Sequence, residues 1–235
     1  MNIFITGGNR GLGLELVLEG ARRGHHIFAT VRGEQASAQL EQALQENGNL
    51  RSAVTFLQAD VRDEASIKAI ADQLRQEGVK LDSIVNSAAV LIGRENGIGS
   101  LNISDVELSF DINLYGPLRV VKHLLPYLSE GEGGSIINIS SEAGSIHRAY
   151  GGDYPYALSK AALNMFSQQL KQLLANRGID VWSIHPGWMR TDMGGSKAPL
   201  SPSESAAAIV DIIERKVKID AAMSFIDYRG GAMEL

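Results

Sequence analysis

Short, continuously apolar runs alternate along the chain with longer segments whose apolar residues recur every three or four positions. The run Ser135–Ser140 (SIINIS) is typical of a strand that is covered on both faces. Leu163, Leu170 and Leu174 follow the spacing of a helix with one buried face. The pattern predicts seven strands: Asn2–Thr6, Ile27–Val31, Ala53–Ala59, Leu81–Asn86, Ser135–Ser140, Asp180–Ile184 and Ala222–Ile226. It predicts six helices near 11–23, 34–47, 63–77, 102–129, 156–176 and 202–217.

This regular alternation of strands and helices determines the expected fold class. Strands that alternate with helices form βαβ units, and these units build a parallel sheet. The sequence therefore predicts an α/β fold, a single-domain Rossmann-type doubly wound parallel sheet of about seven strands flanked by helices. No linker, charge block or internal repeat divides the chain, so we expect residues 1–235 to form one domain.

Composition narrows the classes of partner. The chain is 44% hydrophobic and 21% charged, as is ordinary for a globular protein, and its net charge of −5 disfavours nucleic acid or an anionic membrane as a partner. No apolar stretch approaches the ~20 residues of a membrane span, and no signal peptide is evident, so we expect a cytoplasmic protein. There is no cysteine, and the five histidines have no metal-ligand spacing, so we expect no metal site.

A glycine-rich turn, Thr6–Gly13, directly follows the first predicted strand and opens the first predicted helix. Glycines let backbone amides approach a phosphate closely, and a helix N-terminus favours negative charge. A tight connection without a ligand is the alternative, because the spacing differs from the usual dinucleotide fingerprint. We expect a dinucleotide to bind at Gly7, Asn9, Arg10, Gly11, Leu12 and Gly13.

The residue after the second predicted strand bears on which dinucleotide binds. An acid at this place binds the 2′-hydroxyl of NAD, whereas an arginine accommodates the 2′-phosphate of NADP. Here the strand ends on Arg32, and Arg10 could reach the same phosphate from the glycine-rich turn. Glu34 is the counter-evidence, and we interpret it as a first-turn helix residue. The sequence favours NADP(H), with NAD(H) as the alternative.

Six motifs follow one another along the chain. They are Thr6-Gly7 with Gly11 and Gly13; Asp60-Val61; Asn86-Ser87-Ala88-Ala89; Asn113; Ser141 with Tyr156 and Lys160; and Pro186-Gly187 with Thr191. Together and in this order they resemble the motifs of the short-chain dehydrogenase/reductase family over essentially the whole chain. The resemblance implies that Asp60 and Val61 meet the adenine, that Asn86 and Ala88 contact the cofactor, and that Pro186, Gly187 and Thr191 lie near the nicotinamide. The family usually has Asn and Gly where this chain has Ser87 and Ala89, which puts cofactor affinity there in question.

Tyr156 and Lys160 are four positions apart, so on a helix both side chains lie on one face, one turn apart. We expect the ammonium to lower the pKa of the phenol from its usual ~10. By the resemblance, Tyr156 donates a proton to a carbonyl oxygen, Lys160 also binds the nicotinamide ribose, Ser141 binds the substrate oxygen and Asn113 anchors a water.

Other residues of the same types compete for these roles. Ser141 lies fifteen positions before Tyr156, whereas the family more often has thirteen, so the segment between them carries a two-residue extension. Ser140 is the alternative to Ser141, although strand alternation points the two in opposite directions. Tyr150 and Tyr154 compete with Tyr156 in residue type only, because neither has a lysine four positions on.

The sequence thus predicts an NADPH-dependent oxidoreductase that acts on a small carbonyl or alcohol, and by the resemblance a homo-oligomer, either dimer or tetramer. Substrate choice is expected in the loops 90–101, 144–155 and 188–202, where Tyr150, Trp188, Met189 and Met193 suggest an apolar pocket. The segments 185–205 and 224–235 resemble the branch that contains sniffer-like carbonyl reductases and C-factor. The alternative is therefore a nucleotide-binding signalling protein on the same fold; a sugar epimerase or a methyltransferase is a more distant one.

Overall fold

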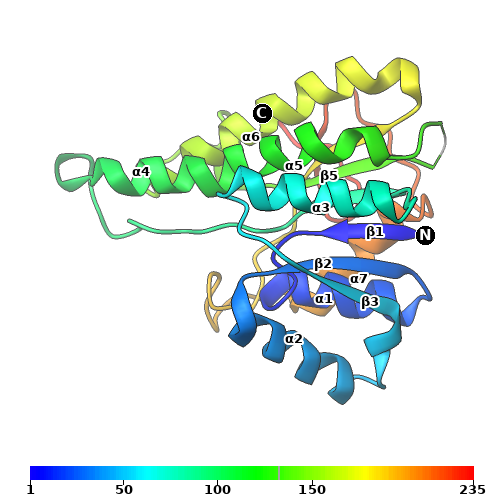
Figure 1. Cartoon of the computed structure of the whole chain (residues 1–235). Coiled ribbons are helices and arrows are strands. Elements are labelled where there is room, and N and C mark those ends of the chain that lie inside the picture. The colour runs from blue at the N-terminus through cyan, green and yellow to red at the C-terminus, as the bar shows by residue number, and fades with distance from the viewer. Residues whose placement is uncertain (132) are drawn as a thin grey trace.

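The computed structural model describes residues 1–131 and 133–235, which form one seven-stranded sheet between two layers of helices (Figure 1). All strand pairs are parallel, in the order β3-β2-β1-β4-β5-β6-β7. The strands are β1 Asn2–Ile5, β2 His26–Val31, β3 Val54–Gln58, β4 Ser83–Asn86, β5 Ser135–Ile139, β6 Asp180–His185 and β7 Phe225–Asp227. The predicted doubly wound Rossmann-type fold is confirmed, and its order reverses between β1 and β4, where such sheets bind ligands.

Two hydrophobic clusters cover the two faces of the sheet. Alternate side chains of β1 belong to different clusters, since Ile3 and Ile5 pack with α1, α2 and α7 while Phe4 packs with α3, α5 and α6. The helices are α1 Gly11–Arg22, α2 Gly33–Glu46, α3 Glu64–Gln76, α4 Ile103–Phe110, α5 Gly116–Leu124, α6 Tyr154–Leu174 and α7 Pro202–Ile213. Among the described residues, no helix has the length and apolar character needed to cross a membrane.

The helical segment predicted near 102–129 is present from Ile103 to Tyr127, but it is not one uniform α-helix. The segment consists of α4, a π-helical turn at Asp111–Tyr115, α5 and a 3₁₀ turn at Leu125–Tyr127. Pro117 explains why the α-helical hydrogen-bond pattern is interrupted, because it has no N–H to donate to the carbonyl four residues earlier. The π turn presents Asn113 to the loop that follows β4.

Several other element ends differ from the prediction by one to four residues. Helix α6 begins at Tyr154, two residues earlier than predicted, with Pro155 in its first turn, where a missing N–H costs nothing. Helix α7 ends at Ile213 instead of 217, because Arg215 adopts a positive φ of 57°. The last strand is only Phe225–Asp227.

Candidate active site

A cavity of about 840 Å³ lies at the carboxyl ends of the strands, between the glycine-rich turn and α6. It brings together segments far apart in the sequence, including the turn after β1 and the loops after β4, β5 and β6. Most of the predicted site residues line it: Gly7, Asn9, Arg10, Gly11, Leu12, Gly13, Arg32, Asp60, Val61, Ala88, Ser141, Tyr156, Lys160, Pro186, Gly187 and Thr191.

The glycine-rich turn is shaped so that side chains could not replace its glycines. Gly7 and Gly11 have positive φ angles of 70° and 54°, and a Cβ on Gly13 would lie 2.1 Å from the Gly7 carbonyl oxygen. Helix α1 starts at Gly11, and its preceding residue, Arg10, makes no side-chain cap, so the first N–H groups of the helix remain available to a ligand. The turn therefore fits the pyrophosphate of a dinucleotide.

Two arginines, Arg10 and Arg32, line the end of the cavity that lies away from α6. Arg32 follows β2 directly, its side chain is 57% exposed, and its Nη1 lies 3.9 Å from Asp60. Asp60 is held by Arg62 at 2.6 Å, and this hydrogen bond lowers the pKa of the carboxyl group. Arg10 forms no salt bridge within residues 1–131 and 133–235. Glu34 occupies the first turn of α2, as expected, and is not among the lining residues. Two guanidinium groups therefore face this end, which fits a phosphate.

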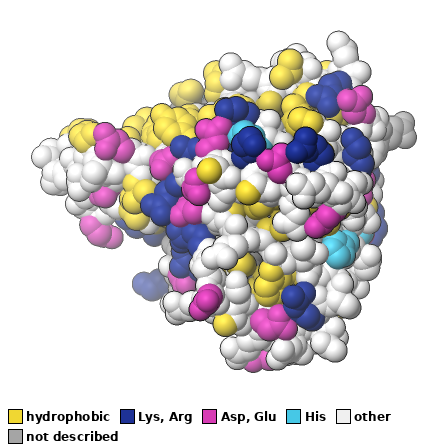
Figure 2. Space-filling model, viewed as in Figure 1, with side chains coloured by type: hydrophobic (Ala, Val, Ile, Leu, Met, Phe, Trp, Pro, Cys, Tyr) yellow, Lys and Arg dark blue, Asp and Glu magenta, His cyan; other side chains and the backbone are white. Residues whose placement is uncertain are grey.

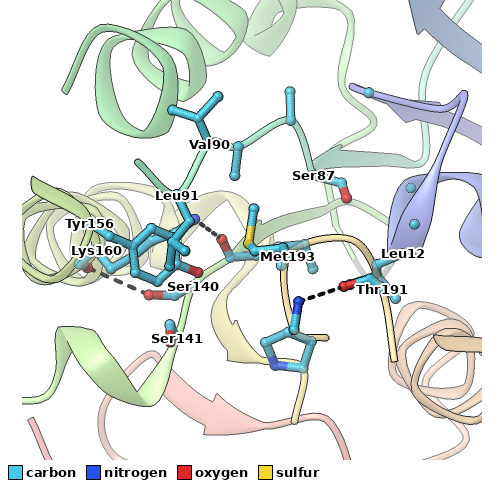
Figure 3. A pocket seen from close by; sticks show the side chains of 18 of the residues that line it. Leu12, Ser87, Val90, Leu91, Ser140, Ser141, Tyr156, Lys160, Thr191 and Met193 are labelled. Carbon is cyan, nitrogen blue, oxygen red and sulfur yellow. Dashed lines mark hydrogen bonds between the residues drawn. The ribbon is translucent and has the colours of Figure 1, made fainter. Parts of the chain in front are cut away.

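Tyr156 and Lys160 project from the same face of α6 into the opposite end of the cavity (Figure 3). Both are buried, at 9% and 2% exposure, and Lys160 Nζ donates a 2.7 Å hydrogen bond to the Ile139 carbonyl at the end of β5. The Nζ atom lies 5.5 Å from the centre of the Tyr156 ring. Ser141 follows β5 on the same wall of the cavity, and its Oγ accepts a 3.2 Å hydrogen bond from the Ala143 N–H.

The charges of this pair differ from the sequence-based expectation. Burial raises the pKa of Tyr156 to about 12, against an opposing effect of the Ser141 hydroxyl, and burial lowers the pKa of Lys160 to about 7. The expected fall of the phenol pKa is therefore wrong. Its physical reason is desolvation, which disfavours both charged forms and leaves the amine only partly charged at neutral pH. Tyr156 is thus protonated at neutral pH and able to donate.

Asn113 and Asn86 lie behind the cavity and are not among its lining residues. Asn113 is 1% exposed; its amide donates to the Val90 carbonyl (2.9 Å) and Ser159 Oγ (3.0 Å), and its oxygen accepts from the Val90 N–H (2.9 Å). Asn86 donates to Asn138 Oδ1 at 2.8 Å inside the sheet. Asn113 thus supports the loop after β4, and Val90 of that loop lines the cavity.

The rival residues are engaged elsewhere. Ser140 Oγ donates to Asn164 Oδ1 at 2.7 Å in the buried layer between the sheet and α6. The Tyr150 hydroxyl donates to Asp153 at 2.7 Å, and Tyr154 is not a lining residue. The structure thus brings only Tyr156, of the three tyrosines, next to both Ser141 and a lysine.

Asn164 is a supporting residue that the sequence reasoning missed. It is 1% exposed, accepts from Ser140 Oγ and Ser183 Oγ (2.5 Å), and donates to the Gly144 carbonyl (3.1 Å). It therefore ties α6 to β5, to β6 and to the turn that follows Ser141. The available signal was its position four residues after Lys160, on the same helical face.

The predicted substrate loops line the cavity around Tyr156. They contribute apolar side chains from both sides, namely Val90, Leu91, Trp188, Met189 and Met193. Trp188 is 55% exposed, and its Nε1–H donates to the Gly194 carbonyl at 2.8 Å, which ties the two ends of that loop segment together. Figure 3 shows Met193 between Tyr156 and Thr191. The expected apolar lining is present, together with charged residues that the sequence did not place there.

Comparison with known proteins agrees with this geometry. The family profile described as short chain dehydrogenase matches residues 1–200. The C-signal protein of Myxococcus xanthus is 34% identical over 151 residues, which cover 64% of this chain and 90% of that protein. The carbonyl reductase Sniffer of D. melanogaster is similar in structure, with a TM-score of 0.86, 29% identity, and coverage of 100% of this chain and 99% of that one. The NADPH-bound carbonyl reductase from chicken fatty liver has a TM-score of 0.85 at 29% identity, with 100% and 94% covered.

Proposed function

Because this chain belongs to the short-chain dehydrogenase/reductase family, as a member of the carbonyl reductase and C-factor type, we propose that it is an NADPH-dependent oxidoreductase that reduces an aldehyde or ketone to an alcohol. The observation that carries this proposal is the convergence of Tyr156, Lys160 and Ser141 on a cavity that begins at the glycine-rich turn. The solved neighbours add support, since one is described as an NADPH-bound carbonyl reductase.

NADP(H) is the cofactor whose chemistry fits the residues present. The amide groups at the start of α1 would hold the pyrophosphate, and Arg10 and Arg32 would hold the 2′-phosphate through charge-assisted hydrogen bonds. When bound, the reduced nicotinamide supplies the hydride for the carbonyl carbon. NAD(H) would lack the phosphate that these two guanidinium groups match.

The residues of α6 and β5 would handle the proton. Burial keeps Tyr156 protonated at neutral pH, so its hydroxyl can donate a proton to the carbonyl oxygen as negative charge develops there. Ser141 would donate a hydrogen bond to the same oxygen and stabilise that charge. Lys160, with a pKa of about 7, would exchange protons near neutral pH while the Ile139 carbonyl fixes its position.

Replacing the acid tests this function. Tyr156→Phe should lower turnover on a panel of aldehydes and diketones by about 10²- to 10⁴-fold, because it removes the transferable proton. Turnover is followed by the absorbance of NADPH, and binding by NADPH fluorescence, which should stay near the wild-type value. Undiminished turnover in this variant would contradict the role assigned to Tyr156.

A signalling role without turnover is the second candidate, favoured by the similarity to the C-signal protein. The complete set of Ser141, Tyr156 and Lys160 supports retained chemistry. A wild-type protein that binds NADPH tightly but reduces no carbonyl in the panel would favour the signalling role.

We also propose that the chain forms a homo-oligomer, either dimer or tetramer, through α4, α5 and α6. Hydrophobic side chains lie at the surface over these helices (Figure 2). The exposed ones are Ile103, Leu118, Leu158, Met165 and Leu173. Burial of such a patch between copies would remove apolar surface from water. The molar mass in solution, from light scattering, tests this assembly.

A further inference from the structure

A charged cluster lines the substrate end of the cavity and takes no part in the proton chemistry described above. It consists of Arg94, Tyr150 and Asp153. Arg94 Nε donates to Asp153 Oδ1 at 3.3 Å, and the Tyr150 hydroxyl donates to Asp153 Oδ2 at 2.7 Å. Both oxygens of the carboxylate are therefore engaged, one by each partner.

The backbone holds this cluster in place on both sides. Gly93 has a φ of 68°, and a Cβ there would lie 3.1 Å from Asp105 Oδ2 on α4 and 3.4 Å from Pro155 Cγ on α6. Asp153 adopts a left-handed φ of 46° just before α6, three residues ahead of Tyr156. A non-glycine residue in that conformation is uncommon and points to a local requirement. The Asp153 side chain is only 12% exposed, so it forms a fixed anchor for Arg94.

The anchor leaves most of the Arg94 guanidinium free for a ligand. Its Nε contacts Asp153, whereas its two Nη groups make no hydrogen bond to any residue within 1–131 and 133–235. The Arg94 side chain is 51% exposed and lines the cavity. A guanidinium group held through one edge presents its remaining donors in a planar arrangement that matches a carboxylate.

This guanidinium also lies within electrostatic range of the reacting group. Besides the dominant effect of burial, the charge of Arg94 lowers the pKa of Tyr156 and that of Asp153 raises it. The cavity holds one further arginine at this end, Arg148, but Glu142 faces its Nη1 at 3.1 Å. Of these two arginines, Arg94 is therefore the one that a largely buried carboxylate, Asp153, holds within electrostatic range of Tyr156.

We infer that Arg94 binds a carboxylate on the carbonyl substrate, so that the substrate class is an oxo acid. The inference rests on the proposed carbonyl reduction, because it concerns the same site. The apolar side chains of the 188–202 loop would cover the body of such a molecule, while the carbonyl oxygen meets Tyr156 and the carboxylate meets Arg94. Asp153 acts as a positioning residue, since it holds the guanidinium through Nε.

Matched charged and neutral substrates test the inference. Pyruvate, acetoacetate and levulinate, which separate carbonyl and carboxylate by different lengths, are each compared with their methyl ester. Wild type should show a higher kcat/KM for at least one acid than for its ester. Arg94→Gln should lower kcat/KM for that acid by about 10- to 150-fold, the range for losing a hydrogen bond to a charged group, and should change the ester by less than about threefold.

Control variants separate this role from a general effect on the site. Arg148→Gln should retain the preference for the acid, whereas Arg94→Lys, which keeps the charge without the planar donors, should lose part of it. Loss of the preference in Arg148→Gln alone, or an equal loss on acid and ester in Arg94→Gln and Arg94→Lys, would overturn the inference. So would a wild-type protein that reduces the esters at least as well as every acid. A wild type that reduces no carbonyl at all contradicts the proposed function instead.

Discussion

The inner wall and the rim of the same cavity are built in different ways. The inner wall is formed by β5 and α6, where Tyr156 and Lys160 line the cavity, Asn164 lies behind them, and all three are at most 9% exposed. Lys160 and Asn164 are held by 2.7 Å hydrogen bonds to residues at the end of β5. On the rim, the side chains of Arg32 and Arg94 are more than half exposed, and among residues 1–131 and 133–235 each pairs with one carboxylate, Asp60 and Asp153 respectively.

Because the two parts are built differently, we assign them different roles: the buried wall carries the proposed reaction, and the exposed rim selects which molecules bind. A polar group buried in the wall is costly to leave unpaired, so each side chain there that we propose to be catalytic is also part of the packing of the fold. A charged group on the rim keeps its hydration and adds little to stability. Substitutions in the wall should therefore change both turnover and stability, whereas substitutions on the rim should change only which molecules bind.

Lys160→Met should have the largest effect on catalysis. It removes the amine beside Tyr156, so we expect kcat to fall by about 10²- to 10⁴-fold in steady-state assays with NADPH. The methionine has a similar length and no charge to bury, so the variant should remain folded. If kcat of Lys160→Met stays within threefold of the wild-type value, the proposed role of the buried wall in catalysis is contradicted.

The lowered pKa of Lys160 also predicts that the free energy of unfolding depends on pH. Burial lowers the pKa of Lys160 from 10.5 to about 7, so between these values the unfolded chain binds one more proton than the folded chain. The free energy of unfolding of wild type should therefore rise with pH across this window, relative to Lys160→Met, and the two should run parallel below about pH 7. Urea titrations of both proteins at pH 6, 7, 8 and 9 measure the difference. A constant difference over this range contradicts the lowered pKa.

Asn164→Ala should have the next largest effect, mainly on stability. It leaves Ser140, Ser183 and the Gly144 carbonyl without their buried partner, so we expect a loss of about 2–3 kcal/mol in the free energy of unfolding. Because Asn164 also supports the turn after Ser141, kcat should fall under conditions where the variant is fully folded. Ser167→Ala is the matched control from the same helix, since it removes a buried hydroxyl that binds Asn138 on β5 and the Leu163 carbonyl instead of the turn after Ser141. Equal losses of kcat in both variants would contradict a specific role for Asn164.

The wall shows how much of the site the sequence could predict. Spacing alone placed Tyr156 and Lys160 on one helical face, and the apolar run before Ser141 placed it at the end of a strand. Regular elements carry such periodic signals, so the parallel sheet and the glycine-rich turn could also be predicted. The pKa of Tyr156 was not, because it depends on how deeply the phenol is buried, which no local pattern reports.

The rim was less predictable for a related reason. Arg94 and Asp153 lie 59 positions apart in the chain and meet only because two irregular loops cross in space. The sequence predicted a helical segment near 102–129, but not the π turn within it, where Asn113 contacts the Val90 backbone. Contacts between loops follow from the tertiary arrangement, and side-chain spacing does not report them.

Arg32→Ala should have the smallest effect on the molecule and a selective effect on binding. The side chain is 57% exposed and its nearest carboxylate oxygen, on Asp60, is 3.9 Å away, so the free energy of unfolding should change by less than about 0.5 kcal/mol. NADPH affinity should fall by about tenfold or more, since a charge-assisted hydrogen bond to the 2′-phosphate is lost, while NADH affinity should stay nearly constant. Fluorescence titrations with each cofactor measure the ratio. Arg62→Ala is the control, because Arg62 binds Asp60 at 2.6 Å without lining the cavity, and it should leave the ratio unchanged. An equal loss for both cofactors in Arg32→Ala would overturn the preference for NADPH and would show that this part of the rim does more than select.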